Sequence, residues 1–204
     1  MSVTQHDLDH QQGTNAKVLA YLLQPENDFY VVTHENGERQ TTFEFLRLVT
    51  TQLPEIRVLL DVGAQILEVF NRQVVKAWLD IDRVAAGAIY FNENDELTVL
   101  TRNGTTQLLS SSPLSQQLDR CLVYLDHAHT RGTDIRLPTG TRAAVTLGLK
   151  VTKDALVQGS FWRCDPIAIS HGCGFQAACG CANWVMVTRS CFLRRPKLTG
   201  TSVQ

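Results

Sequence analysis

The sequence predicts an α/β protein whose mostly parallel sheet lies between layers of helices and loops, a three-layer fold. Segments with the periodicity of strands alternate with segments of helical periodicity, which is typical of parallel sheets. Two short apolar runs, 56–62 and 121–125, have the continuous pattern of strands that are covered on both faces. With 204 residues, 44% hydrophobic and 19% charged, the chain is long and apolar enough to form one globular domain.

The charge balance and hydropathy exclude several classes of protein. Lys and Arg number 19 and Asp and Glu number 20, so the formal net charge is -1 and we expect no nucleic-acid partner for this chain alone. No apolar run approaches the roughly 20 residues that span a bilayer, and 1–13 lack the apolar core of a secretory signal. We therefore expect an intracellular protein, cytoplasmic or nuclear, with no membrane partner.

The first elements follow a polar terminus, and 1–14 are expected to be disordered. A helix is predicted over 16–24 and a strand over 27–33. The pair 41–42 supplies a threonine N-cap for a helix that stops near Pro54.

The middle of the chain carries the clearest patterns. After the strand at 56–62, apolar residues recur at spacings of three and four and predict a helix over 64–79. Strands at 88–91 and 97–100 are separated by a polar turn and predict a hairpin.

The last predicted elements complete the α/β unit. A short helix is expected to end at about Arg120, followed by a strand at 121–125, another at 143–147, and a helix capped by Thr152. We place the unit at 15–158.

The densest cluster of reactive side chains in the first 160 residues follows the strand at 121–125. Ligands of open α/β sheets bind outside the carboxyl ends of the strands, so this position suits a site. Three interpretations stay open, of which the simplest is a polar loop whose side chains bind backbone groups. The second is nucleotide or phosphate handling, although no G-x-x-x-x-G-K-[ST] motif occurs. Its candidate residues are Thr130, Arg131, Gly132, Thr133 and Asp134.

The third interpretation is thiol chemistry. Cys121 would be the nucleophile, His127 or His129 the base, and Asp126 the group that orients the base. A straight strand would put the thiol roughly 20 Å from the histidines. A buried cysteine that acts as a small apolar side chain is the alternative.

Several blocks of sequence, in register, resemble a known family of very large fungal proteins that are built from domains of unknown function and catalogued as ubiquitinyl hydrolases. The similarity spans about 16–158. Its blocks are 24–27, 58–68, 95–100, 117–121, 124–138 and 142–148.

The resemblance implies a cysteine-type deubiquitinase family acting in ubiquitin-dependent protein turnover, with ubiquitin or ubiquitinated proteins as partners. It also implies that this chain is a fragment of a larger polypeptide, whose upstream part carries a phosphate-binding Gly-Lys-Ser loop. ATP with Mg²⁺ would then belong to the full-length protein, and we expect no cofactor and no metal in this fragment.

A second resemblance concerns 130–135, T-R-G-T-D-I, which is similar to a motif in the second RecA-like lobe of helicase-like motors, including the bacterial preprotein translocase ATPase. The resemblance implies a RecA-like fold and a loop that couples nucleotide state to a bound polymer.

One position departs from the first family: His127 stands where relatives have an acid in L-D-E-A-H or L-D-D-x-H. An acidic function at that position would be impaired here.

The C-terminal segment differs in composition, since five of the six cysteines lie between Cys164 and Cys191. Their spacing does not match the paired C-x-x-C arrangement of zinc sites. Shifting the reading frame of the codons for 178–192 permits a sequence similar to that of the relatives. We therefore predict that 159–204 are an irregular tail, out of frame with the rest of the domain.

Overall fold

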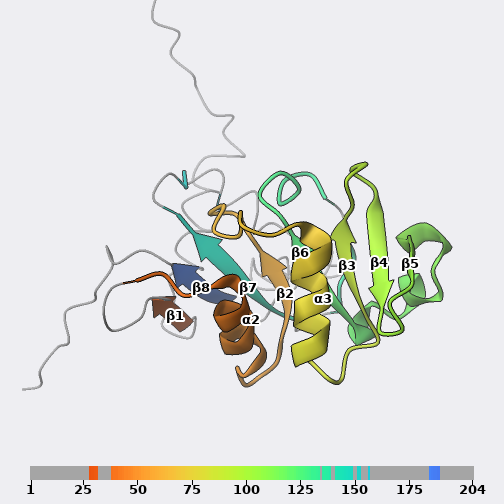
Figure 1. The fold of residues 1–204 in the computed structure, drawn as a ribbon, viewed down its shortest axis with the longest axis horizontal. Coiled ribbons are helices and arrows are strands. Elements are labelled where there is room, and N and C mark those ends of the chain that lie inside the picture. The colour runs from red at the N-terminus through yellow and green to blue at the C-terminus, as the bar shows by residue number, and fades with distance from the viewer. Residues whose placement is uncertain are drawn as a thin grey trace, which may run out of the picture.

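The computed structural model describes residues 28–31, 38–133, 135–138, 141–148, 151–152, 156 and 184–188. They form an α/β structure around one mixed sheet (Figure 1). The elements in chain order are β1 (Asp28–Val31), α2 (Thr42–Thr50), β2 (Ile56–Leu60), α3 (Asn71–Ile81), β3 (Gly87–Phe91), β4 (Leu97–Thr101), β5 (Thr106–Leu108), three 3-10 turns (Leu109–Ser111, Pro113–Gln116 and Leu118–Arg120), β6 (Cys121–Leu125), β7 (Arg142–Leu147) and β8 (Trp184–Thr188).

The sheet is mostly parallel, which confirms the predicted fold class at this level. Its strand order is β1-β8-β7-β2-β6-β3-β4-β5, and all pairings from β1 to β3 are parallel. β4 is antiparallel to both β3 and β5, so the predicted hairpin is confirmed. Leu60 of β2 is in register with Leu125 of β6, so the residues that follow these strands meet at the carboxyl edge of the sheet.

The two helices α2 and α3 cover one face of the sheet (Figure 1). Phe45 of α2 and Trp78 of α3 are completely buried there, in one apolar cluster with Tyr124 of β6. The opposite face packs against the 3-10 turns and against the segments after β6, including Ile135 and Leu156. Both faces of the central strands are therefore covered, which explains their unbroken apolar runs.

The predicted N-cap of α2 is confirmed. The Thr41 hydroxyl accepts a hydrogen bond from the backbone N–H of Glu44, and the Glu44 carboxylate accepts one from the Thr41 backbone N–H. This reciprocal pair is a capping box, which satisfies N–H groups that the first helical turn leaves free. The sequence therefore determines where this helix begins.

Helix α3 is shorter at its start than predicted. It begins at Asn71, whereas the periodicity predicts a helix from residue 64. Ala64 has a φ of 48°, which interrupts a right-handed helix. The Asp61 carboxylate also accepts hydrogen bonds from the N–H groups of Gln65 and Ile66, which turn the chain away from helical geometry.

The segment before β6 also differs from its prediction, because three 3-10 turns take the place of one short helix. The Ser112 hydroxyl accepts from the N–H of Leu114 and so starts a new turn at Pro113. β5, which precedes these turns, was not predicted.

Only part of the terminal predictions can be compared with the structure. β8 lies inside 159–204, so these five residues form a strand in the sheet and not an irregular tail. The remaining residues of that segment, including Cys164 and Cys191, lie outside the described residues, as do 1–14 and the helix predicted at 16–24. Within the described part of the chain, no helix combines the length and apolar character needed to cross a membrane.

Candidate functional site

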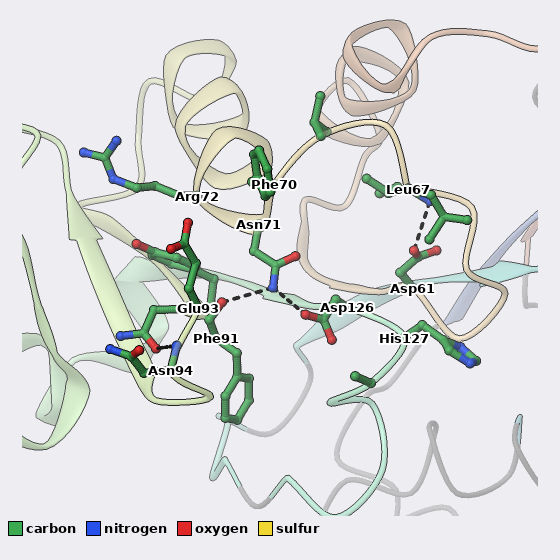
Figure 2. A pocket seen from close by; sticks show the side chains of 15 residues that line it. Asp61, Leu67, Phe70, Asn71, Arg72, Phe91, Glu93, Asn94, Asp126 and His127 are labelled. Atoms are coloured by element: carbon green, nitrogen blue, oxygen red, sulfur yellow. Dashed lines mark hydrogen bonds between the residues drawn. The ribbon is translucent and has the colours of Figure 1, made fainter.

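A pocket of about 610 Å³ lies at the carboxyl edge of the sheet, above the ends of β2, β3 and β6 (Figure 2). The loop between β2 and α3 forms one wall, and the turn after β3 forms the opposite wall. Asp126, which directly follows β6, lies between them. This is the position where open α/β sheets bind ligands.

Asp61 holds the loop that forms the first wall through hydrogen bonds to its backbone. It directly follows β2, is 1% exposed, and accepts hydrogen bonds from the backbone N–H groups of Gln65 and Ile66 at 2.8 and 3.0 Å. The Thr146 hydroxyl donates a third at 2.6 Å and accepts one from the Gly63 N–H at 3.1 Å. The carboxylate therefore ties the loop after β2 to the last part of β7.

Two glycines allow the loops after β2 and β7 to touch. A Cβ atom on Gly63 would lie 2.5 Å from the backbone N of Gly148, and one on Gly148 would lie 2.4 Å from the Gly63 carbonyl oxygen. Both distances are shorter than real Cβ contacts, and the opposing atoms belong to backbone. Neither position has room for a larger residue.

Asp126 is the centre of the hydrogen-bond network in the pocket floor. The Asn71 amide nitrogen donates to the Asp126 carboxylate and to the Phe91 carbonyl oxygen, the latter at 3.0 Å (Figure 2). From the other side, the backbone N–H and the Nδ1 of His129 donate to Asp126 Oδ1 at 3.0 and 2.7 Å. Asp126 thus joins the start of α3, the end of β3 and the turn after β6.

His129 connects the turn after β6 with the turn between β3 and β4. Its Nε2 lies 3.2 Å from Asp95 Oδ1, and its ring stacks on Phe91 with centroids 3.9 Å apart and planes 7° apart. The imidazole therefore contacts two carboxylates and one aromatic face. These contacts hold the side chain in one orientation.

The pKa of Asp126 is lowered. Partial burial alone would raise it, but hydrogen bonds from Asn71 and His129, together with the charge of His129, favour the carboxylate more strongly. The ionised form therefore stabilises the folded state. Because the folded pKa lies below the ordinary value of 3.8, this contribution is present above that pH and is lost as the pH falls through the folded pKa.

We predict that Asp126→Asn lowers the free energy of unfolding by about 1–3 kcal/mol at pH 7, because an amide cannot accept all of these hydrogen bonds as a carboxylate does. The difference from the unmodified protein should shrink as the pH falls below 3.8, because Asp126 then takes up a proton more readily in the unfolded chain than in the folded protein, and it should be lost below the folded pKa. Urea unfolding at pH 7 and pH 3 measures both values. Asp80→Asn, at an exposed i,i+4 pair with Lys76, is the control and should change stability by less than about 0.5 kcal/mol. A pH-independent difference for Asp126→Asn would contradict the assignment.

The turn that carries the predicted nucleotide-coupling residues lies on the same edge of the sheet. The N–H of Thr130 donates to the Asp126 carbonyl oxygen, and the Thr133 hydroxyl donates to the His129 carbonyl oxygen. Gly132 has a φ of 76°, a conformation that favours glycine. Arg131 is exposed, Thr130 is buried, and Asp134 lies outside the described residues.

The predicted catalytic set is only partly brought together. Asp126 and His129 are hydrogen-bonded, but Cys121 is the first residue of β6 and therefore lies at the amino edge of the sheet. Four residues of strand put the thiol about 13 Å from the carboxyl end. Cys121 is 1% exposed, and burial together with the nearby Asp119 raises its pKa to about 11. The structure thus does not assemble the predicted thiol site.

His127 does not take part in the network of Asp126. Its Nδ1 lies 2.9 Å from the Val62 carbonyl oxygen and donates to it, so this histidine ties the turn after β6 to the loop after β2. Among the residues that the structure describes, no group of three or more His, Cys, Asp or Glu side chains has an arrangement that could hold a metal ion.

Three residues of the site were not identified from the sequence. Asn71 lies in a segment predicted as helix interior, and Phe91 contributes through its backbone and ring. Asp61 lies inside the strand predicted at 56–62 but directly follows β2, and an acid near the end of a buried strand is a signal that could have identified it. Comparisons of the chain with protein-family models, with curated proteins and with solved structures found no match.

Proposed function

We propose that the α/β unit is the second, RecA-like lobe of a helicase-like motor, inactive alone and completed by a nucleotide-binding lobe elsewhere in a larger polypeptide. The observation that carries the proposal is the position of 129–133. This turn lies at the carboxyl edge of a mostly parallel sheet and presents exposed Arg131 next to Gly132.

The hydrogen bonds of the turn support a coupling role. The turn is fixed to the sheet by Asp126, and through His129 it contacts Asp95 on the turn between β3 and β4. A group that binds Arg131 would therefore act on a rigidly anchored segment, which can pass a displacement to the rest of the lobe. ATP and Mg²⁺ would be held mainly by the other lobe, since the chain has no G-x-x-x-x-G-K-[ST] motif.

The test is an NMR titration of the full chain with Mg–ADP at millimolar concentrations. We expect amide shifts concentrated on 126–133 and no ATP hydrolysis. Arg131→Ala should remove most of the shifts, because its guanidinium is the exposed cation of the turn. Arg83→Ala is the matched control, since Arg83 also reaches solvent but precedes β3 at the opposite edge. Shifts that are absent, spread over the surface, or unchanged by Arg131→Ala would contradict the proposal.

The deubiquitinase activity that the family resemblance implies has less support from the geometry. Its candidate nucleophile, Cys121, donates to the Gln117 carbonyl oxygen at 3.6 Å and has no histidine at its end of β6 among the described residues. Such an environment favours the neutral thiol.

We predict that ubiquitin carrying a C-terminal thiol-reactive group does not label Cys121 at pH 7.5. With a pKa of about 11, fewer than about one thiol in a thousand is ionised at this pH, and the side chain is 1% exposed. Peptide mass mapping distinguishes this cysteine from the others in the chain. Denaturation in urea should make Cys121 reactive toward iodoacetamide, which serves as the control. Labelling of native Cys121 by the ubiquitin probe would instead favour the deubiquitinase.

A further inference from the structure

The pocket at the carboxyl edge has an apolar entrance that solvent reaches. Leu67 and Phe70 line it with 76% and 72% of their surface exposed, although both are large apolar side chains. Ile66 and Tyr90 line it more deeply and are buried. Exposed apolar side chains next to a cavity are typical of ligand contacts.

The polar groups of the pocket floor are hydrogen-bond acceptors. Asn71 uses its amide N–H₂ to donate to Asp126 and to the Phe91 carbonyl oxygen, which leaves its Oδ1 as an acceptor. A carboxylate has about four acceptor positions, and three hydrogen bonds occupy three of those of Asp126, which leaves about one for a ligand. A ligand must therefore supply the donors.

The charge of the pocket is negative. Asp61, Glu93 and Asp126 line it, and Arg72 is the one arginine or lysine among the described residues around it. In Figure 2 the Arg72 side chain extends away from Asn71 and Asp126, so it does not neutralise the floor. Asp61 is almost fully buried and its hydrogen bonds come from neutral groups. A cation that enters this pocket is attracted by these carboxylates.

We propose that the pocket binds an arginine side chain of a polypeptide, with the guanidinium on Asn71 and Asp126 and the neighbouring apolar residues on Leu67 and Phe70. A guanidinium has five N–H donors and no acceptor, which complements a floor of acceptors. Its planar face also stacks on aromatic rings such as that of Phe70. The proposal depends on the pocket alone and does not require the motor function.

The test compares acetyl-Leu-Arg-Leu-amide with acetyl-Leu-citrulline-Leu-amide, titrated into the full chain and followed by NMR. Citrulline has nearly the shape of arginine but a neutral urea head, so it isolates the charge. We expect the arginine peptide to shift amides of 67–72, 92–94 and 126–128, and the citrulline peptide to bind at least about tenfold more weakly. Equal binding of the two peptides, or no binding, would overturn the proposal.

Exposed substitutions at the pocket keep the test independent of folding. Phe70→Ala should lower the affinity for the arginine peptide about fivefold and Glu93→Gln about threefold, whereas Phe43→Ala should leave the affinity unchanged. Phe43 is the matched control, because it is 52% exposed on α2 and does not line the pocket. Adenosine is titrated as the competing ligand class. If adenosine binds the same residues more tightly than the arginine peptide, the pocket is a nucleoside site and the proposal is wrong.

Discussion

Replacement of Asp61 by alanine is expected to lower the free energy of unfolding by about 3–5 kcal/mol, among the largest effects of a single change in this protein. The side chain is 1% exposed and accepts three hydrogen bonds, from Gln65 N–H, Ile66 N–H and the Thr146 hydroxyl. Alanine would leave these donors buried or half-buried without an acceptor. It would also release the loop that forms one wall of the pocket.

Urea unfolding of the full chain at pH 7 measures this loss. Asp61→Asn is the informative second variant, because it keeps the size of the side chain and one acceptor oxygen, and it should cost about half as much. Asp80→Ala, on the exposed face of α3, should cost less than about 1 kcal/mol. A cost for Asp61→Ala as small as that of Asp80→Ala would show that these hydrogen bonds do not stabilise the fold.

Replacement of Gly63 by alanine is expected to destabilise the protein by about 3 kcal/mol or to prevent folding. The new Cβ atom would meet the Gly148 N at 2.5 Å and the Leu147 carbonyl carbon at 2.6 Å. Both atoms belong to backbone at the end of β7, and they move only if the end of that strand shifts. The Asp61 to Thr146 hydrogen bond would be stretched by the same movement.

Gly104→Ala is the control for this prediction. Gly104 has a φ of 82°, and a Cβ atom added to it would meet no atom of the described residues within 4 Å, so the substitution tests backbone strain without a steric clash. Gly104→Ala should lower the free energy of unfolding by about 1 kcal/mol. Thermal unfolding by circular dichroism separates the two variants, and a Gly63→Ala cost no larger than that of Gly104→Ala would contradict the close approach of the two loops.

The parallel sheet could be predicted because its strands have a strong local signal. β2 and β6 are buried on both faces, so nearly every residue in them is apolar, and the pattern is recognisable without a partner strand. The hairpin of β3 and β4 could also be predicted, because its two strands are neighbours in the sequence and are joined by a short polar turn. The order of the strands was not predictable, since β6 enters between β2 and β3 through pairings between residues far apart in the sequence.

The start of α3 shows why element boundaries were less predictable. Residues 64–70 have helical spacing of apolar side chains, but they form an irregular loop that Asp61 holds, in which Ile66 is buried whereas Leu67 and Phe70 are exposed. Site residues were likewise less predictable where their role depends on contacts between distant parts of the chain. The turn after β6 was identified from its composition, whereas the contribution of Asn71 depends on the three-dimensional meeting of α3, β3 and β6. The distance of Cys121 from the histidines follows from strand geometry alone.

The sheet ends on one side with β5, which has only three residues and is followed directly by the 3-10 turn Leu109–Ser111. Unpaired backbone groups on a long edge strand can recruit a strand from another molecule and begin aggregation. A three-residue edge offers few such groups, and the turn that follows interrupts further pairing. The short length of β5 therefore protects this side of the protein from intermolecular sheet extension.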